Sequence, residues 1–381
     1  MIMLASNNVT IPPENIDVII DHLHADPATL RACSLVSRGW VSSSRYHLFS
    51  SVTLDNWNGP SFLALLQSPS GPDIGALVQH LSLHTEKALD WFIKSIPVLS
   101  SHLQPTALTF DISNYTDPDD FEDDDEYEYG YRENRRRVRK DASVFLNCFP
   151  TVTTLHLSIY CDTFLEAAEL ISSFRSLKKL SLGLLWTQES DTAISPRHLV
   201  LPGSIEALSI PSDGESHFIR WLLCHTNPPH PSKLTLDFHV AQAEPVAACL
   251  RELGGSLETL SLKSSYGFTE HVTLVHQSNL RSLSIHVWKN APHIVWRLLS
   301  QLSSVSLEEV DFWAWYPTEE PDARDSWSKL DALLSDPQFA GLRRIIIHVN
   351  AEHRATIEAE LLPQAHTRNV LCFKNQHGSI Y

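Results

Sequence analysis

Glycine and basic residues are both scarce in this sequence. Only 13 of its 381 residues are glycine, about half of the usual ~7% share, so glycine-rich loops that hold phosphate groups are disfavoured, and nucleotide-using enzymes with them. Lys and Arg number 29 against 45 Asp and Glu, which gives a formal net charge of -16. A negative field repels nucleic-acid backbones and anionic lipids, so neither nucleic acid nor a membrane is expected as a partner.

Cysteine pairs, leader-like segments and long apolar runs are also missing. The six cysteines are scattered, with no CxxC motif, which is typical of reduced, buried thiols and indicates no zinc site. Residues 1–8, a short tail, lack a basic stretch and a long apolar region, and no run of ~18 apolar residues occurs anywhere. We therefore expect a soluble protein of the cytoplasm, the nucleus or both.

Local catalytic motifs do not occur. The sequence contains no G-x-S-x-G, no H-E-x-x-H and no G-x-x-x-x-G-K-[ST], the frameworks of common hydrolases, zinc enzymes and phosphate-binding enzymes. We expect no enzyme, no catalytic residue, no metal and no cofactor. A hydrolase built from distant Ser, His and Asp stays open as a third hypothesis, because such sites are recognised in space and not in sequence.

The residues that are present supply a large core. The chain is two to three times as long as a usual domain of ~100 to 200 residues, which favours a modular or extended arrangement. Hydrophobic residues make up 43% of it and charged residues only 19%. This balance excludes general disorder, so most of the chain is expected to fold.

Residues 9–50 have the apolar spacing of short helices. Four apolar residues at i, i+3, i+4 and i+7 define one face of a first helix, and Asp26-Pro27 has the order of an N-cap and a first helical residue. The apolar residues of this pattern are Ile16, Ile19, Ile20, Leu23, Leu30, Cys33, Val36, Trp40, Leu48 and Phe49. Some forty residues bury too little area to be stable alone, so we expect this helical module to dock onto something.

This module also carries a set of landmark residues: Ile11, Pro12, Glu14, Ile16, Ile19, Ile20, Leu23, Leu30, Cys33, Leu35, Val36, Ser37, Arg38, Trp40, Arg45, Leu48 and Phe49. Together they resemble an F-box, most closely that of fungal F-box proteins. The resemblance implies docking to a Skp-type adaptor and, through it, to a cullin-RING ubiquitin ligase. The residues implied to bind the adaptor, or to form the module's own core, are Pro12, Ile16, Ile19, Ile20, Leu23, Leu30, Val36 and Trp40. The alternative is a helical cap at the end of a repeat array.

Residues 51–381 repeat one pattern: apolar, two variable, apolar, one variable, apolar. The ten copies are Val78/Leu81/Leu83, Pro105/Leu108/Phe110, Val152/Leu155/Leu157, Leu177/Leu180/Leu182, Ile205/Leu208/Ile210, Pro231/Leu234/Leu236, Leu257/Leu260/Leu262, Leu280/Leu283/Ile285, Leu307/Val310/Phe312 and Leu342/Ile345/Ile347. From Leu155 to Val310 the middle residue recurs after 25, 28, 26, 26, 23 and 27 residues, within the ~20 to 29 of leucine-rich repeats.

Segments with helical spacing lie between these copies, for example at 164–174, 218–224, 246–253, 294–302 and 327–334. The region therefore resembles an irregular leucine-rich-repeat solenoid, which implies an α/β fold with parallel strands on the concave face and helices on the convex face. The asparagine that this family places after each strand is absent except at Asn350.

The alternation of the strands predicts which side chains face away from the helices. Residues between the apolar positions point to the other face of the sheet. Toward the carboxyl-terminal end these residues include tryptophans with charged neighbours, a composition typical of binding hot spots. The predicted target-binding residues are Lys263, His286, Trp288, Asp311, Trp313 and Trp315. The alternative is that Phe312 to Tyr316 pack as a core that closes the solenoid.

One insert breaks the repeat. Residues 114–141 contain eleven acidic and six basic residues, a charge run typical of a solvated loop. An import signal, a nucleic-acid contact of the basic half, or masking of that half by the acidic half are the other interpretations.

These patterns lead to one functional hypothesis and one alternative. The hypothesis is a substrate-recognition subunit of a Skp-cullin-F-box ubiquitin ligase, with a target protein on the concave face and the chemistry on other subunits. The alternative is a leucine-rich-repeat scaffold for protein interactions that has no ubiquitin role.

Overall fold

The structure is a computed structural model. It describes residues 12–84, 90–111, 144–161, 163–183, 185–186, 199–210, 215–225, 228–239, 242–264, 270–287, 291–302, 306–314 and 323–375. The chain divides into two compact units, Met1–His156 and Leu157–Tyr381. The predicted tail 1–8, the whole predicted insert 114–141, Trp288 and Trp315 lie outside the described residues.

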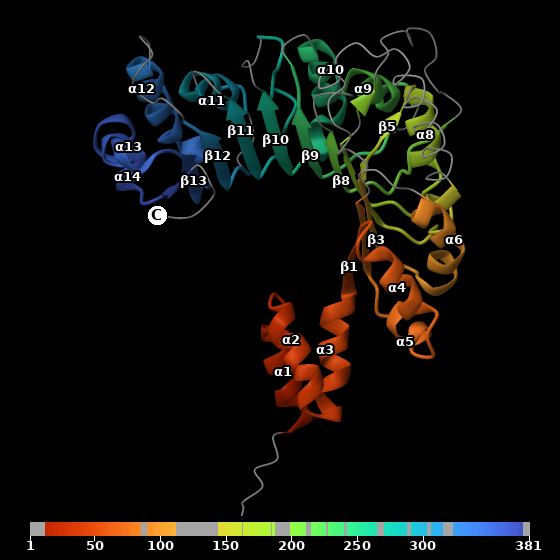
Figure 1. Cartoon of the computed structure of the whole chain (residues 1–381). Helices are drawn as coiled ribbons and strands as arrows, with labels where there is room; N and C mark the ends of the chain where they lie inside the picture. Colours follow the sequence, from red (N-terminus) through yellow and green to blue (C-terminus); the bar gives the residue numbers. More distant parts are fainter. Residues whose placement is uncertain are drawn as a thin grey trace, which may run out of the picture. The chain divides into compact units, whose positions relative to one another are not determined.

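The first unit begins with three helices and continues with parallel strands (Figure 1). Its elements are α1 (Pro13–His22), α2 (Pro27–Val36), α3 (Arg38–Ser50), β1 (Ser51–Leu54), α4 (Gly59–Leu66), α5 (Gly71–Gly75), β2 (His80–His84), α6 (Asp90–His102) and β3 (Ala107–Asp111). The predicted boundary at residue 50 coincides with the end of α3. The first unit, however, holds both the helical module and the first strands of the repeat region.

The second unit alternates parallel strands with helices. Strand β4 (Thr154–Ser158) spans the boundary between the units. It is followed by β5 (Tyr160–Cys161), α8 (Phe164–Ser172), β6 (Lys179–Leu182), β7 (Leu185–Trp186), β8 (Ala207–Ile210), α9 (Glu215–Leu223), β9 (Lys233–Asp237), α10 (Ala243–Leu253), the 3-10 helix η3 (Gly254–Ser256), β10 (Thr259–Ser264), β11 (Ser282–Val287) and α11 (Ala291–Leu299).

The last elements are β12 (Glu309–Trp313), α12 (Ala323–Leu334), the 3-10 helix η4 (Pro337–Phe339), β13 (Arg344–His348), α13 (Ala351–Thr356), the π-helix η5 (Ile357–Leu361), α14 (Pro363–Thr367) and β14 (Leu371–Lys374). The strands lie in the order β6-β8-β9-β10-β11-β12-β13-β14, and β5 pairs separately with β7. Helices α8 to α12 cover one side of this sheet (Figure 1).

The repeat pattern gives each of the ten predicted strands a buried face toward the helices. All members of the ten predicted triplets are buried, and neighbouring copies are in register, for example Leu234 with Leu260 and Leu260 with Leu283. The two alternating residues of each triplet point toward the helices, since successive side chains of a strand point to opposite faces. The predicted α/β class with strand and helix repeats is therefore confirmed.

Four of the described strands were not predicted: the two-residue strands β5 and β7, which pair with each other, and β1 and β14 of the large sheet, which were missed for different reasons. Strand β1 carries the same spacing, with Phe49, Val52 and Leu54, but Phe49 had been assigned to the helical module. Strand β14 has Arg368 in the first apolar slot. The guanidinium of Arg368 donates to the carbonyl oxygens of Leu334 and, at 2.9 Å, of Phe339, so hydrogen bonds replace the usual apolar contact there.

The three N-terminal helices are held by side-chain caps and cross-links. The Asp26 carboxylate accepts hydrogen bonds from the backbone N–H of Ala28 and Thr29, both at 3.1 Å, as an N-cap of α2. The Thr29 hydroxyl donates to the same carboxylate and lowers the pKa of Asp26. Helices α1 and α3 are joined by Asp21 Oδ1 and His47 Nε2 at 2.7 Å. The predicted short helices are thus present.

Candidate functional site

The helical module divides its apolar residues between a small core and an exposed surface. Among the predicted adaptor residues, Ile20 and Leu30 are 0% and 1% exposed, so they belong to the module's own core. Ile19 and Val36 are 44% and 65% exposed. Pro12 is also exposed, while Ile16, Leu23 and Trp40 are half-buried.

Two further apolar residues of the module are on its surface. Val18 in α1 is 54% exposed and Leu35 in α2 is 86% exposed. Leu35 is one of the landmark residues of the module, and neither it nor Val18 was predicted as a binding residue, because helical periodicity marks the buried stripe and gives no direct signal for apolar residues outside it. Among the described residues of α1 and α2, the exposed large apolar residues are Val18, Ile19, Leu35 and Val36, which we call the module surface.

In the second unit, four predicted target-binding residues lie on the sheet face opposite the helices. Lys263 in β10 is in register with His286 in β11. The ring centroids of His286 and Trp313 are 5.3 Å apart. Trp313 in β12 is in register with His348 in β13 and stacks on it, with centroids 5.0 Å apart and an interplanar angle of 11°. These side chains form one row across neighbouring strands.

His348 and Lys374 extend the row beyond the prediction. His348 is in register with Lys374 in β14. The sequence contained a signal for His348, because it lies between the inward-facing Ile347 and Val349. Lys374 could not be placed because β14 itself was not predicted. We call Lys263, His286, Trp313, His348 and Lys374 the open-face row.

Asp311 lies between the two histidines of this row. Its Oδ1 is 3.2 Å from His348 Nε2 and 3.9 Å from His286 Nε2. The side chains of Asp311 and His348 are only 18% and 9% exposed. The hydrogen bond between the two side chains joins His348 Nε2 to Asp311 Oδ2 at 3.4 Å, and Asp311 Oδ1 has no hydrogen-bond partner within the described residues.

Burial controls the protonation of His286. It lowers the pKa of His286 to about 4, against a weaker upward effect of Asp311, while Lys263 and His348 add to the lowering. At neutral pH His286 is therefore an uncharged ring with one N–H, able to hydrogen-bond without contributing charge.

The convergence of Ser284, His286 and Asp311 does not form a catalytic triad. Ser284 Oγ lies 2.8 Å from His286 Nε2, and Asp311 approaches the same nitrogen. A triad needs the carboxylate on Nδ1 and the hydroxyl on Nε2, so that the imidazole is oriented while it accepts a proton. This serine therefore has no base oriented for it. Within the described ranges, no group of three or more His, Cys, Asp or Glu side chains is arranged to hold a metal ion.

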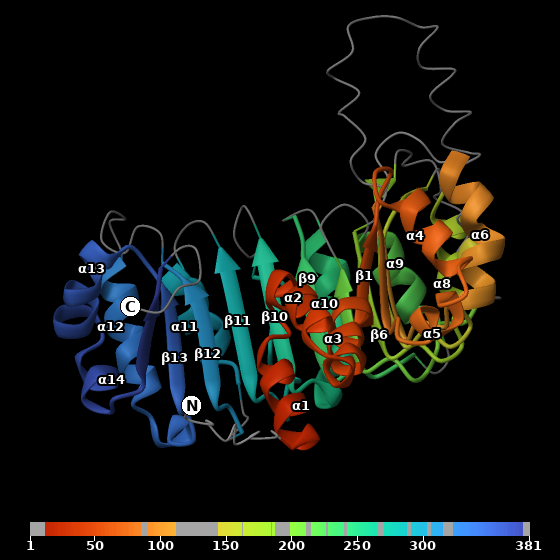
Figure 2. The same ribbon diagram turned by 60° about the horizontal axis from the view of Figure 1, so that its bottom comes forward.

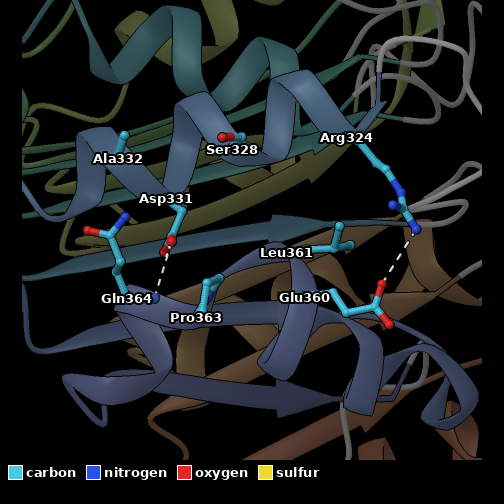
Figure 3. Close-up of a pocket in the computed structure, with 8 residues that line it drawn as sticks. All are labelled: Arg324, Ser328, Asp331, Ala332, Glu360, Leu361, Pro363 and Gln364. Carbon is cyan, nitrogen blue, oxygen red and sulfur yellow. Dashed lines mark hydrogen bonds and ion pairs between the residues drawn. The ribbon is translucent and has the colours of Figure 1, made fainter.

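A separate cavity of about 260 Å³ lies between α12 and the segment from η5 to α14 (Figure 3). Asp331 points from α12 toward Gln364, whose backbone N–H donates to Oδ2 at 3.1 Å, and the N–H of Ala365 donates to Oδ1 at 3.0 Å. Arg324 and Glu360 face each other at the other end, 3.5 Å apart. Because both oxygens of Asp331 already cap α14, the cavity wall is structural.

The cysteines depart in part from the prediction. All six lie in described segments and none forms a disulfide. Cys33, Cys161 and Cys249 are buried, as predicted, and burial raises the pKa of the Cys249 thiol to about 12. Cys224, however, is exposed, and Cys148 and Cys372 are half-buried, because they lie at helix ends and on the outer strand, where neighbouring repeats do not cover them.

Comparisons with known proteins give likenesses to solved structures but none in sequence. No family model matches the chain, and no curated protein matches it in sequence. Among solved structures, it is similar to the crystal structure of the leucine-rich repeat-containing protein LegL7 from Legionella pneumophila, with 12% identity, a TM-score of 0.37, and coverage of 88% of this chain and 89% of that chain. None of these findings supports an F-box relationship or a fungal origin, which stay predictions.

Within the residues that the structure describes, no helix is both long and apolar enough to cross a bilayer.

Proposed function

We propose that the chain is a scaffold for protein interactions and that a partner protein binds the open-face row of its second unit. One observation carries this proposal. Helices cover one face of the sheet (Figure 1), while the other face leaves Trp313 and His286 partly exposed in a row of polar side chains. A partly exposed aromatic residue among polar side chains is the composition of an interface hot spot.

Quantitative affinity capture tests this proposal. We expect Trp313→Ala to reduce recovery of the specific partner by about tenfold or more, because hot-spot truncations cost at least ~2 kcal/mol. Ser209→Ala, on the same sheet face in β8, is the matched control and should leave recovery unchanged. Equal recovery with all three proteins would contradict binding at this row.

The second candidate function is substrate recognition for a Skp-cullin-F-box ubiquitin ligase in the cytoplasm or nucleus. Besides the F-box resemblance, the module surface supports it: four large apolar side chains in α1 and α2 are exposed between 44% and 86%. Exposed apolar residues in a module too small for a large core favour a covering partner. In this proposal the module surface contacts a Skp-type adaptor and the open-face row holds the target.

Binding of the purified full chain to a purified Skp-type adaptor tests the second candidate. We expect micromolar or tighter binding, loss of it in the double variant Leu35→Asp/Val36→Asp, and no change in Arg45→Ala, an exposed residue of α3. Circular dichroism of each variant checks that the helices persist. If the unmodified chain does not bind the adaptor, the ubiquitin-ligase proposal fails and only the scaffold proposal remains.

A further inference from the structure

The open-face row is a continuous feature of five neighbouring strands. Its members lie in β10, β11, β12, β13 and β14, in the register given above. Figure 2 shows four of these strands, β10 to β13, side by side. With ~4.8 Å between neighbouring strands, the row is about 19 Å long. An extended segment of about six residues has this length.

Hydrogen-bond donors dominate the row. Lys263 and Lys374 occupy its ends and the two histidines flank Trp313. Asp311 is the carboxylate closest to the centre, and it is already engaged at 3.2 Å by His348. No ion pair among the described residues involves either lysine, although Asp237 in β9 is in register with Lys263 on the same face. The two ammonium groups therefore keep their charge available to a ligand.

The centre of the row also contains a histidine nitrogen without a hydrogen-bond partner and two serine hydroxyls. His348 is nine-tenths buried, with 9% of its side chain exposed, and its Nδ1 has no hydrogen-bond partner within the described ranges. Because this nitrogen is enclosed, its missing hydrogen bond is a free-energy cost of the packing and not a contact offered to a ligand. Serine hydroxyls of the adjacent positions, Ser261 and Ser284, lie two residues before Lys263 and His286 on the same face.

We propose that the open-face row binds a short acidic segment of the partner protein, with Asp or Glu carboxylates paired to Lys263 and Lys374 and the chain between them lying over Trp313. This inference rests on the proposed scaffold function and deepens it. The charge of the row favours an acidic partner, because a basic segment would meet an ammonium group at each end of the row. The net charge of -16 disfavours long polyanions, so a nucleic acid fits less well than a short peptide.

Three labelled probes of similar length test the proposal by fluorescence anisotropy with the full chain. They are hexaglutamate, hexalysine and a single-stranded oligothymidylate. We expect hexaglutamate to bind, with an affinity that falls as salt is added, because exposed ion pairs are screened. Hexalysine and the oligonucleotide should bind at least about tenfold more weakly. Tighter binding of either one would overturn the proposal.

Matched variants locate the binding. Lys263→Gln/Lys374→Gln should weaken hexaglutamate binding by about tenfold, since each exposed ion pair contributes up to about fivefold. Lys179→Gln removes an exposed lysine from the same face in β6 and should change nothing. An equal loss in both variants, or no loss in either, would mean that the row does not bind the peptide, and would overturn the proposal.

Two variants distinguish a failure of the acidic-segment proposal from a failure of the scaffold proposal. If Trp313→Ala abolishes partner capture while Lys263→Gln/Lys374→Gln leaves both capture and hexaglutamate binding intact, the scaffold function stands and the acidic-segment inference fails. If the lysine variant loses hexaglutamate binding and captured partner alike, both stand. Thermal melts of each variant exclude a general loss of folding.

Discussion

The helical module and the second unit differ in how far their apolar side chains are buried. In the second unit every predicted repeat residue is buried, because each strand and helix packs against the next. In the module, Leu35 and Val36 are 86% and 65% exposed, because three short helices can cover only a few residues such as Ile20 and Leu30. Apolar residues at regular spacing therefore form a core where one strand-and-helix repeat packs against the next. They stay exposed in the module, where no further repeat covers them.

The largest expected effect is in the repeat core. Leu260 is fully buried between its in-register neighbours Leu234 and Leu283. We expect Leu260→Ala to lower the free energy of unfolding by about 2–5 kcal/mol, since a buried cavity remains. Urea unfolding monitored by tryptophan fluorescence measures it. A loss below about 1 kcal/mol would mean that the repeats are loosely packed.

The next effect concerns the C-terminal end of the same unit. Asp331 is 3% exposed and accepts the N–H groups of Gln364 and Ala365. Asp331→Ala leaves both donors without an acceptor, and we expect a loss of about 2 kcal/mol. Asp331→Asn keeps one acceptor oxygen and should cost about half as much. If Asp331→Ala and Asp331→Asn are equally stable, the cap does not hold α14.

A smaller effect is the pH dependence that His286 gives to the second unit. Burial lowers its pKa to about 4, whereas an unfolded histidine titrates near ~6.5. As the pH falls through this window, the unfolded chain takes up a proton that the folded chain does not, so stability is lost on acidification and is constant above the window. We expect this loss in the free energy of unfolding to be about 1–2 kcal/mol, because solvent screens the partly exposed imidazole.

The variant His286→Gln isolates that contribution. Unfolding of both proteins by urea at about pH 7.5 and about pH 4.5 should show a smaller acid-induced loss in the variant. Identical losses would show that His286 titrates normally and is not desolvated in the row.

The smallest expected effect is in the module. Leu35→Ala removes an apolar side chain that is already in water, so the stability of the isolated chain should change by less than about 0.5 kcal/mol. Thermal denaturation measures this, with the buried Leu30→Ala as the destabilised counterpart. A loss above about 1 kcal/mol in Leu35→Ala would mean that this side is covered within the chain itself, which would remove the contrast between the two regions.

Much of the fold was predictable because its signal is local and repeated. The triplet spacing located all ten of the predicted strands, and Asp26-Pro27 located the start of α2. The triplet spacing did not locate β14, because Arg368 stands at the first apolar position of that triplet. The Arg368 guanidinium donates hydrogen bonds to carbonyl oxygens of α12 and η4. A side chain that satisfies distant backbone groups leaves no periodic trace in the sequence.

The candidate site was predicted only in part. Period-two alternation placed Lys263, His286, Asp311 and Trp313 on the open face, and the register of the strands confirms that they share it. The stacking of Trp313 on His348 and the sharing of Asp311 by two histidines depend on strands far apart in sequence. No local pattern encodes such distances.

By itself, the sequence determined which side of each strand is buried, since leucines at fixed intervals must leave water and successive residues alternate across a sheet. Only the tertiary structure decided which polar residues meet on the other side, because strand register brings Lys263, His286, Trp313, His348 and Lys374 into one row. It also decided that Leu35 and Val36 stay exposed, because burial depends on which neighbours pack against a helix, not on the hydrophobicity of the residue.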